Sequence, residues 1–196
     1  MATYEPRDKY YRKAREKGLP SRAAFKIEEL ISRIKLPPDA RVIDLGCAPG
    51  GWLAILGRVV GDRGRVIGID LAACGNFGAS VETIVADIRD PSLPVILKEK
   101  LGRHADIVTS DLSPRLTGIR EHDDAQFEEL IDAALTMARA TLKPGGVMIA
   151  KLFMSSVFKG ILARFEKNFG SVDVTKVKAT RPGSSELYVI ARGFRG

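Results

Sequence analysis

Four carboxylates and one lysine stand directly at the ends of apolar, strand-like runs of this chain. They are Asp44, Asp70, Asp87, Asp111 and Lys151. Parallel strands present their carboxyl ends at one edge of a sheet, and ligands bind there, so these side chains are expected to form one site. Acids and an amine held together can bind polar ligands and move protons. For Asp44 alone, a role as a helix cap is the structural alternative.

A glycine-rich turn follows the first of these runs. It reads Asp44-Leu45-Gly46-Cys47-Ala48-Pro49-Gly50-Gly51-Trp52 and precedes a helix-like stretch. Glycines let the backbone approach a ligand, and a helix N-terminus offers free N–H groups. An acid such as Asp70 at the end of the second run suits a ribose diol. The pattern therefore predicts a site for a nucleotide-like cofactor.

The same turn disfavours two other enzyme classes. It lacks the G-x-G-x-x-G spacing of dinucleotide-binding folds, and the chain has no Tyr-x-x-x-Lys on a helix, so a short-chain dehydrogenase has little support. It also lacks the lysine followed by Ser or Thr of a P-loop, which disfavours ATP hydrolysis.

The strands and helices that position these residues are predicted by alternating apolar patterns. Strands are expected near 41–45, 65–70, 82–86, 106–110 and 146–151, and helices near 22–34, 50–60, 92–101, 123–141 and 155–168. This alternation predicts an α/β fold with a mostly parallel, doubly wound sheet. Lys143-Pro144-Gly145-Gly146 is expected to be a turn, and Ser21 to cap the first helix. The runs 172–177 and 186–191 predict a terminal antiparallel hairpin.

Length and composition narrow the class of protein. A chain of 196 residues with 45% hydrophobic residues predicts one soluble domain, residues 1–196. No apolar run approaches the roughly 18 residues of a membrane span, and the polar N-terminus shows no secretory signal. Two cysteines and two histidines at unrelated spacings predict no metal site, and they fit a reduced, cytoplasmic setting.

Basic residues are concentrated at the two ends of the chain. The net charge is +7, with +5 in residues 1–26, −3 in residues 27–158 and +5 in residues 159–196. This distribution favours a polyanionic partner, and ordinary solubilising charge is the alternative. Tyr4, Tyr10 and Tyr11 lie among the cations of residues 4–20, where they can stack on bases or pack on the domain.

The Pro-Gly-Gly-Trp turn leads to a family resemblance that covers nearly the whole chain. The chain resembles the RrmJ/FtsJ-type RNA ribose 2′-O-methyltransferases, which use S-adenosylmethionine. The matching blocks are residues 21–26, 44–52, 87–90, 110–114, 151–152 and 184–188. The resemblance implies a Rossmann-like methyltransferase fold. The loop 72–80 is less typical of the family than these blocks.

The resemblance implies a catalytic Lys-Asp-Lys-Glu tetrad made of Lys26, Asp111, Lys151 and Glu186. In the implied reaction, a ribose 2′-hydroxyl attacks the sulfonium methyl group and S-adenosylhomocysteine leaves. Lys151 would act as the base or would orient the hydroxyl. Lys26 and Glu186 would place the ribose, and no metal is required.

The resemblance also implies the residues that contact S-adenosylmethionine. Gly46, Gly50 and Trp52 would frame its methionine end, Asp70 would hold the ribose hydroxyls, Asp87 would face the adenine and Asp111 would lie near the methyl donor. For Trp52, a place in the hydrophobic core is the alternative.

The substrate implied by the resemblance is a uridine of large-subunit, 23S-type ribosomal RNA within an assembling subunit. The basic N-terminal segment, about 1–34, and the region of Lys176, Lys178 and Arg181 would bind RNA phosphates. Three alternatives stay open: a tRNA anticodon loop, an RNA cap ribose, and a catalytically silent RNA-binding module.

Overall fold

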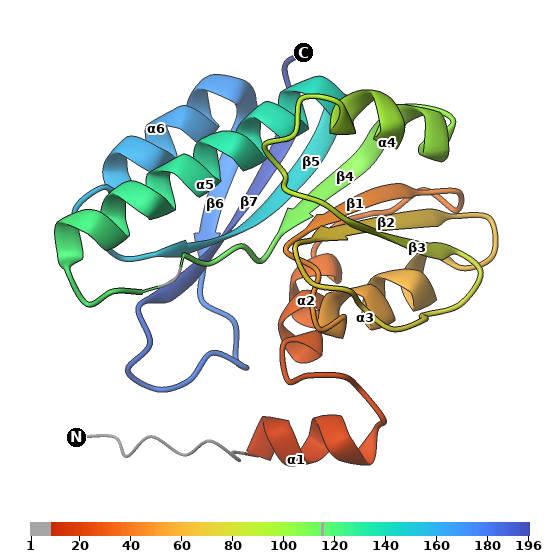
Figure 1. Cartoon of the computed structure of the whole chain (residues 1–196), viewed down its shortest axis with the longest axis horizontal. Coiled ribbons are helices and arrows are strands. Elements are labelled where there is room, and N and C mark those ends of the chain that lie inside the picture. The colour runs from red at the N-terminus through yellow and green to blue at the C-terminus, as the bar shows by residue number, and fades with distance from the viewer. Residues whose placement is uncertain (1–8, 115) are drawn as a thin grey trace.

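Short apolar and β-branched runs form the strands of one seven-stranded sheet. The computed structural model describes residues 9–114 and 116–196. The strands are β1 (Arg41–Leu45), β2 (Arg65–Asp70), β3 (Val81–Val85), β4 (Ala105–Ser110), β5 (Leu142–Phe153), β6 (Phe169–Thr175) and β7 (Glu186–Phe194). Their order in the sheet is β3-β2-β1-β4-β5-β7-β6 (Figure 1).

The first five strands are parallel, and β7 runs antiparallel between β5 and β6. The predicted α/β fold, with a mostly parallel sheet ending in an antiparallel hairpin, is therefore confirmed. The strand order reverses between β1 and β4, so the loops after these two strands diverge and leave a crevice there. The β5–β7 pairing sets Lys151 opposite Tyr188 and Phe153 opposite Glu186.

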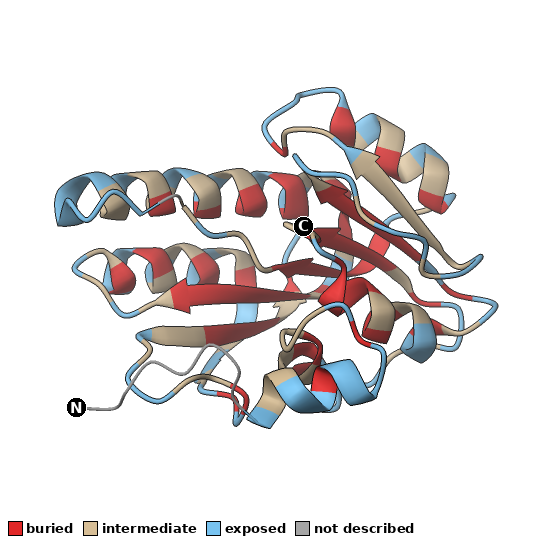
Figure 2. Ribbon diagram, turned by 60° about the horizontal axis from the view of Figure 1, so that its bottom comes forward, coloured by how far each residue is buried: buried red, intermediate tan, exposed pale blue. Residues whose placement is uncertain are grey.

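Helices cover both faces of the sheet (Figure 1). The helices are α1 (Lys9–Glu16), α2 (Ala24–Ile31), α3 (Gly51–Val60), α4 (Leu93–Leu101), α5 (Arg120–Thr141) and α6 (Phe158–Asn168). One hydrophobic core lies under α4, α5 and α6, and a second lies under α1, α2 and α3. Figure 2 shows the buried residues along the central strands and on the inner sides of the helices.

Two local expectations differ from the structure. The first predicted helix is shorter at both ends, because Phe25 N–H and Arg33 N–H bond to carbonyls three residues back, and its N-cap is Ala23 rather than Ser21. The expected turn 143–146 lies inside β5. There Gly145 adopts a φ of +76°, and the pairing with β4 shifts register, so the strand continues through an irregularity instead of starting after a turn.

Candidate functional site

Lys151 and Asp111 form an ion pair at the carboxyl ends of β5 and β4. The Lys151 Nζ lies 3.0 Å from Asp111 Oδ1, and it also donates a hydrogen bond of 2.7 Å to the Asp111 carbonyl. Lys151 is only 7% exposed. Because a lysine is rarely buried unless its charge is paired, these two oxygens explain how it is accommodated.

Lys26 and Glu186 form a second ion pair, between α2 and the first residue of β7. The Lys26 Nζ lies 2.6 Å from Glu186 Oε1, and each side chain is 13% exposed. The buried positions Ala24, Ile27, Leu30 and Ile31 share one face of α2. This packing against the domain brings Lys26 to β7, 160 residues later in the chain.

The two ion pairs lie close enough to influence each other. Burial raises the pKa of Asp111, while Lys151 and then Lys26 oppose this rise. Burial also acts to raise the pKa of Glu186, but the attraction and hydrogen bond of Lys26 outweigh it, so the pKa is lowered. The structure thus brings all four predicted tetrad residues together, from segments far apart in sequence.

Tyr188 is a site residue that the residue-by-residue reasoning did not single out. Its side chain is fully buried, and its hydroxyl donates a hydrogen bond of 2.9 Å to Glu186 Oε1. It lies two residues after Glu186 in β7 and therefore shares a face of the strand with it. That spacing of two within a predicted strand was the available signal.

The glycine-rich turn is held by Asp70. The Asp70 carboxylate accepts hydrogen bonds of 2.9 Å from the N–H groups of Ala48, in the turn after β1, and Ala72, in the loop after β2. Gly46 and Gly50 adopt φ values of +77° and +101°, which disfavour residues with a side chain. The turn therefore depends on these two glycines and on the acid at the end of β2.

Asp44 is buried inside the fold and caps no helix. The N-cap of the following helix is Gly50, and the hydroxyl of Thr109 donates a hydrogen bond of 2.7 Å to Asp44 Oδ1. Burial raises the pKa of Asp44 to about 8. The helix-cap alternative was wrong, because the side chain points to β4 instead of to the start of α3.

A cavity of about 250 Å³ joins the glycine-rich turn to the tetrad. Its lining includes Gly46, Asp70, Asp87 and Asp111, four of the residues predicted to bind the cofactor. Leu71, which is 73% exposed, adds an apolar wall. The Asp87 carboxylate forms an ion pair with Arg89, whose hydrogen bonds lower the pKa of Asp87 to about 2.

Gly50 and Trp52 lie outside the lining of this cavity. Trp52 is 2% exposed and packs in the second core, with its ring centroid 6.1 Å from that of Tyr188. Gly50 lies under Phe77 of the loop 72–80, so close that a Cβ added to it would be 1.9 Å from the Phe77 ring. The turn itself, rather than these two side-chain positions, faces the cavity.

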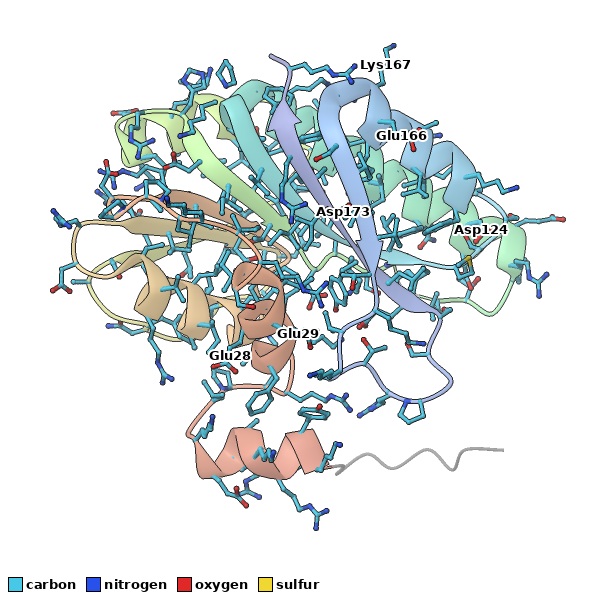
Figure 3. All side chains as sticks on the ribbon, turned by 180° about the vertical axis from the view of Figure 1, so that it is seen from behind. Glu28, Glu29, Asp124, Glu166, Lys167 and Asp173 are labelled. Carbon is cyan, nitrogen blue, oxygen red and sulfur yellow. The ribbon has the colours of Figure 1, made fainter. Side chains whose placement is uncertain are left out.

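The two basic ends of the chain meet beside the tetrad. Lys178 N–H donates a hydrogen bond of 2.9 Å to Glu29 of α2, and Figure 3 shows Glu29 next to the loop that follows β6. Tyr10 of α1 packs against Phe25, with ring centroids 5.7 Å apart. Tyr10 therefore contacts the domain, whereas Tyr4 lies outside the described residues.

The described residues contain no group of three or more His, Cys, Asp or Glu side chains placed to hold a metal ion. Within the same residues, no helix is long and apolar enough to cross a membrane.

Comparisons with known proteins agree on one family. The model of the FtsJ-like methyltransferase family matches residues 19–194. The chain is 42% identical to a ribosomal RNA large subunit methyltransferase E of Anaeromyxobacter dehalogenans, over 98% of this chain and 73% of that protein. It is 41% identical to a protein of the same name from Methanoculleus marisnigri, over 100% of this chain and 96% of that protein.

Solved structures share the fold. A crystal structure named as a ribosomal RNA methyltransferase of Plasmodium falciparum matches with a TM-score of 0.76 and 27% identity, covering 90% of this chain and 98% of that chain. Fibrillarin of Aeropyrum pernix, crystallised with natively bound S-adenosyl-L-methionine, matches with a TM-score of 0.57 and 20% identity, covering 86% and 73%.

Proposed function

The chain belongs to the FtsJ-like methyltransferase family, and we propose on this premise that it methylates a ribose 2′-hydroxyl of large-subunit ribosomal RNA, using S-adenosylmethionine. The observation that carries the proposal is the pair of lysine–carboxylate contacts next to the cavity at the glycine-rich turn. We further propose uridine as the acceptor and a single domain for the whole chain. We also propose a cytoplasmic location, which fits two cysteines in the thiol form, with their sulfur atoms 3.6 Å apart.

The residues around the cavity fit S-adenosylmethionine in their chemistry. Asp70 and Asp87 offer carboxylates to hydroxyl and amine donors, Leu71 offers an apolar surface to adenine, and Gly46 lets the backbone come close. Asp111 lines the same cavity and also binds Lys151, so it connects the cofactor side to the tetrad. When bound, the cofactor supplies the methyl group.

The position of Lys151 supports a role in aligning the attacking hydroxyl. Two Asp111 oxygens within 3.0 Å already hold its amine, so little side-chain freedom is lost when RNA binds. Alignment of this kind supplies a large part of many enzymatic rates. We propose that Lys151 orients the hydroxyl, and that it receives the hydroxyl proton only after its own ammonium group has released a proton. We also propose that Lys26 and Glu186 hold the ribose.

RNA phosphates would be bound by the joined basic ends. The hydrogen bond from Lys178 N–H to Glu29 holds the loop after β6, which carries Lys176 and Lys178, against α2. Figure 3 shows this loop and α1 on the same side of the protein. Basic residues gathered on the side of the tetrad suit a polyanion. Arg181 belongs to the same loop.

Methyl transfer from labelled S-adenosylmethionine tests the proposal. Large ribosomal subunits that lack the modification, total tRNA and capped RNA are offered in parallel to the wild-type protein and to Lys151→Met. Label in the large-subunit RNA, at a linkage that resists alkaline cleavage, is the expected result, and the variant should be inactive. Label in tRNA or capped RNA alone would replace the proposed substrate, and absence of any transfer would contradict the activity.

A further inference from the structure

A second cavity, of about 890 Å³, lies beside the tetrad and is separate from the cofactor cavity in its lining. Three chain segments build it, and each adjoins a tetrad residue. Pro114 lies three residues after Asp111, Phe153 lies two residues after Lys151, and Ser185 directly precedes Glu186. The groove therefore adjoins the tetrad along three chain segments.

Exposed apolar side chains mark this groove. Leu116 is 73% exposed and Met154 is 59% exposed, although both are large hydrophobic residues. The buried Phe127 and the half-buried Phe153 pack edge to face behind them, with ring centroids 5.2 Å apart. Because the exposed pair contributes little to the core, its position next to an active site indicates a ligand with flat apolar faces.

The charges of the groove disfavour a phosphate as its occupant. Its charged lining residues are Arg120, Asp123 and Asp124, a formal net charge of −1. The Asp123 carboxylate already accepts hydrogen bonds from Thr117 and Gly118. Asp124, labelled in Figure 3 near the start of α5, accepts one of 2.5 Å from Ser156. A neutral ligand fits such a lining.

Polar atoms at the rim suit the edge of a nucleobase. Ser155 Oγ is buried and has no hydrogen-bond partner among the described residues, and Ser184 and Ser185 also line the groove. Thioether and aliphatic side chains pack well on flat rings, and hydroxyls bind base edges. We propose, on the basis of the proposed function, that this groove holds the base of the nucleotide whose ribose is methylated.

The test compares Leu116→Ser/Met154→Ser with wild type, using large subunits that lack the methyl group. Val95→Ser is the matched control, because Val95 is 70% exposed but lies on α4, outside the groove. Loss of a base-stacking surface should lower kcat/KM for the RNA by roughly 5- to 100-fold, while the affinity for S-adenosylmethionine and the control stay unchanged. An unchanged kcat/KM in the double variant, with wild type active, would overturn the groove proposal alone. An inactive wild type would instead contradict the proposed function.

A second arm identifies what the groove binds. Once the methylated position is mapped, subunits carrying a different base at that position are methylated by wild type and by the double variant. If the groove holds the base, changing the base and changing the groove remove the same contact. The combined loss in kcat/KM should then be smaller than the product of the two separate losses. Fully multiplicative losses would mean that the groove binds another part of the particle, such as a protein, and would overturn the proposal.

Discussion

Replacing Lys151 with methionine removes one charge of a buried ion pair and leaves the other behind. At the observed separation of 3.0 Å, the attraction between the two charges is about 5 kcal/mol for an effective dielectric constant of roughly 20. Desolvation of the two ions offsets most of this gain. Since the Asp111 side chain is still 22% exposed, we expect a net coupling of about 1–3 kcal/mol.

The coupling is measured with Lys151→Met, Asp111→Asn and the double variant, by urea unfolding at pH 7. Each single variant should lose about 2–4 kcal/mol of unfolding free energy, because its partner stays buried without a counter-charge. The double variant should be more stable than the sum of the two losses predicts. Additive losses would refute the argument that the pair is what accommodates Lys151.

The same three variants also test the role of Lys151 in methyl transfer. None of the three variants should transfer methyl groups, whereas Lys151→Met should still bind S-adenosylmethionine in a calorimetric titration, because Lys151 does not line the cofactor cavity. Lys143→Met is the control at the other end of β5, where Lys143 pairs with Asp106 at 2.6 Å. It should stay active, since Arg103 also neutralises Asp106. Normal turnover by Lys151→Met would refute its role.

Three further predictions concern stability and RNA binding. The pKa of Asp44 rises from 3.8 to about 8 on folding, so the folded protein keeps a proton that the unfolded chain loses. The free energy of unfolding should therefore fall as the pH rises from about 4 to 8. In urea titrations, Asp44→Asn should flatten that fall. Gly50→Ala should lower the free energy of unfolding by about 1–3 kcal/mol and weaken cofactor binding. Gly160 lies in open space on α6, so Gly160→Ala should raise the free energy of unfolding by up to about 1 kcal/mol in the same assay. Neutralising Lys176 and Lys178 should weaken RNA binding. If both lysines contact phosphates of single-stranded RNA, the slope of log affinity against log salt should become smaller by about 1.4. Binding assays at several salt concentrations measure this slope.

Periodicity and turn chemistry predicted most of the fold, but not the order of its last strands. Apolar runs marked β1, β2 and β4 within one residue, because these strands are buried on both faces. The hairpin was predicted as well. That β7 rather than β6 pairs with β5 depends on long-range pairing, to which local sequence gives no guide.

The candidate site was predictable as a set of residues but not as contacts. The resemblance pointed to the tetrad, yet which lysine meets which acid follows only from the sheet order and the packing of α2. For Trp52, the sequence did not decide between a ligand contact and a place in the core. A tryptophan after a glycine turn suits a ligand as well as a core, and the burial of α3 against the sheet decides for the core. The role of Asp44 became clear only from its hydrogen bond to Thr109 of β4.

The insertion of β7 between β5 and β6 has a consequence for biosynthesis. Every other strand and helix of the described fold precedes β7 in the chain, and Glu186 is its first residue. A nascent chain can therefore form the cofactor side of the sheet, with β1, β2 and β4, before Glu186 has left the ribosome. Contacts between segments so distant in sequence form slowly. Methyl transfer would thus require synthesis through β7, because this strand supplies Glu186, the last member of the tetrad.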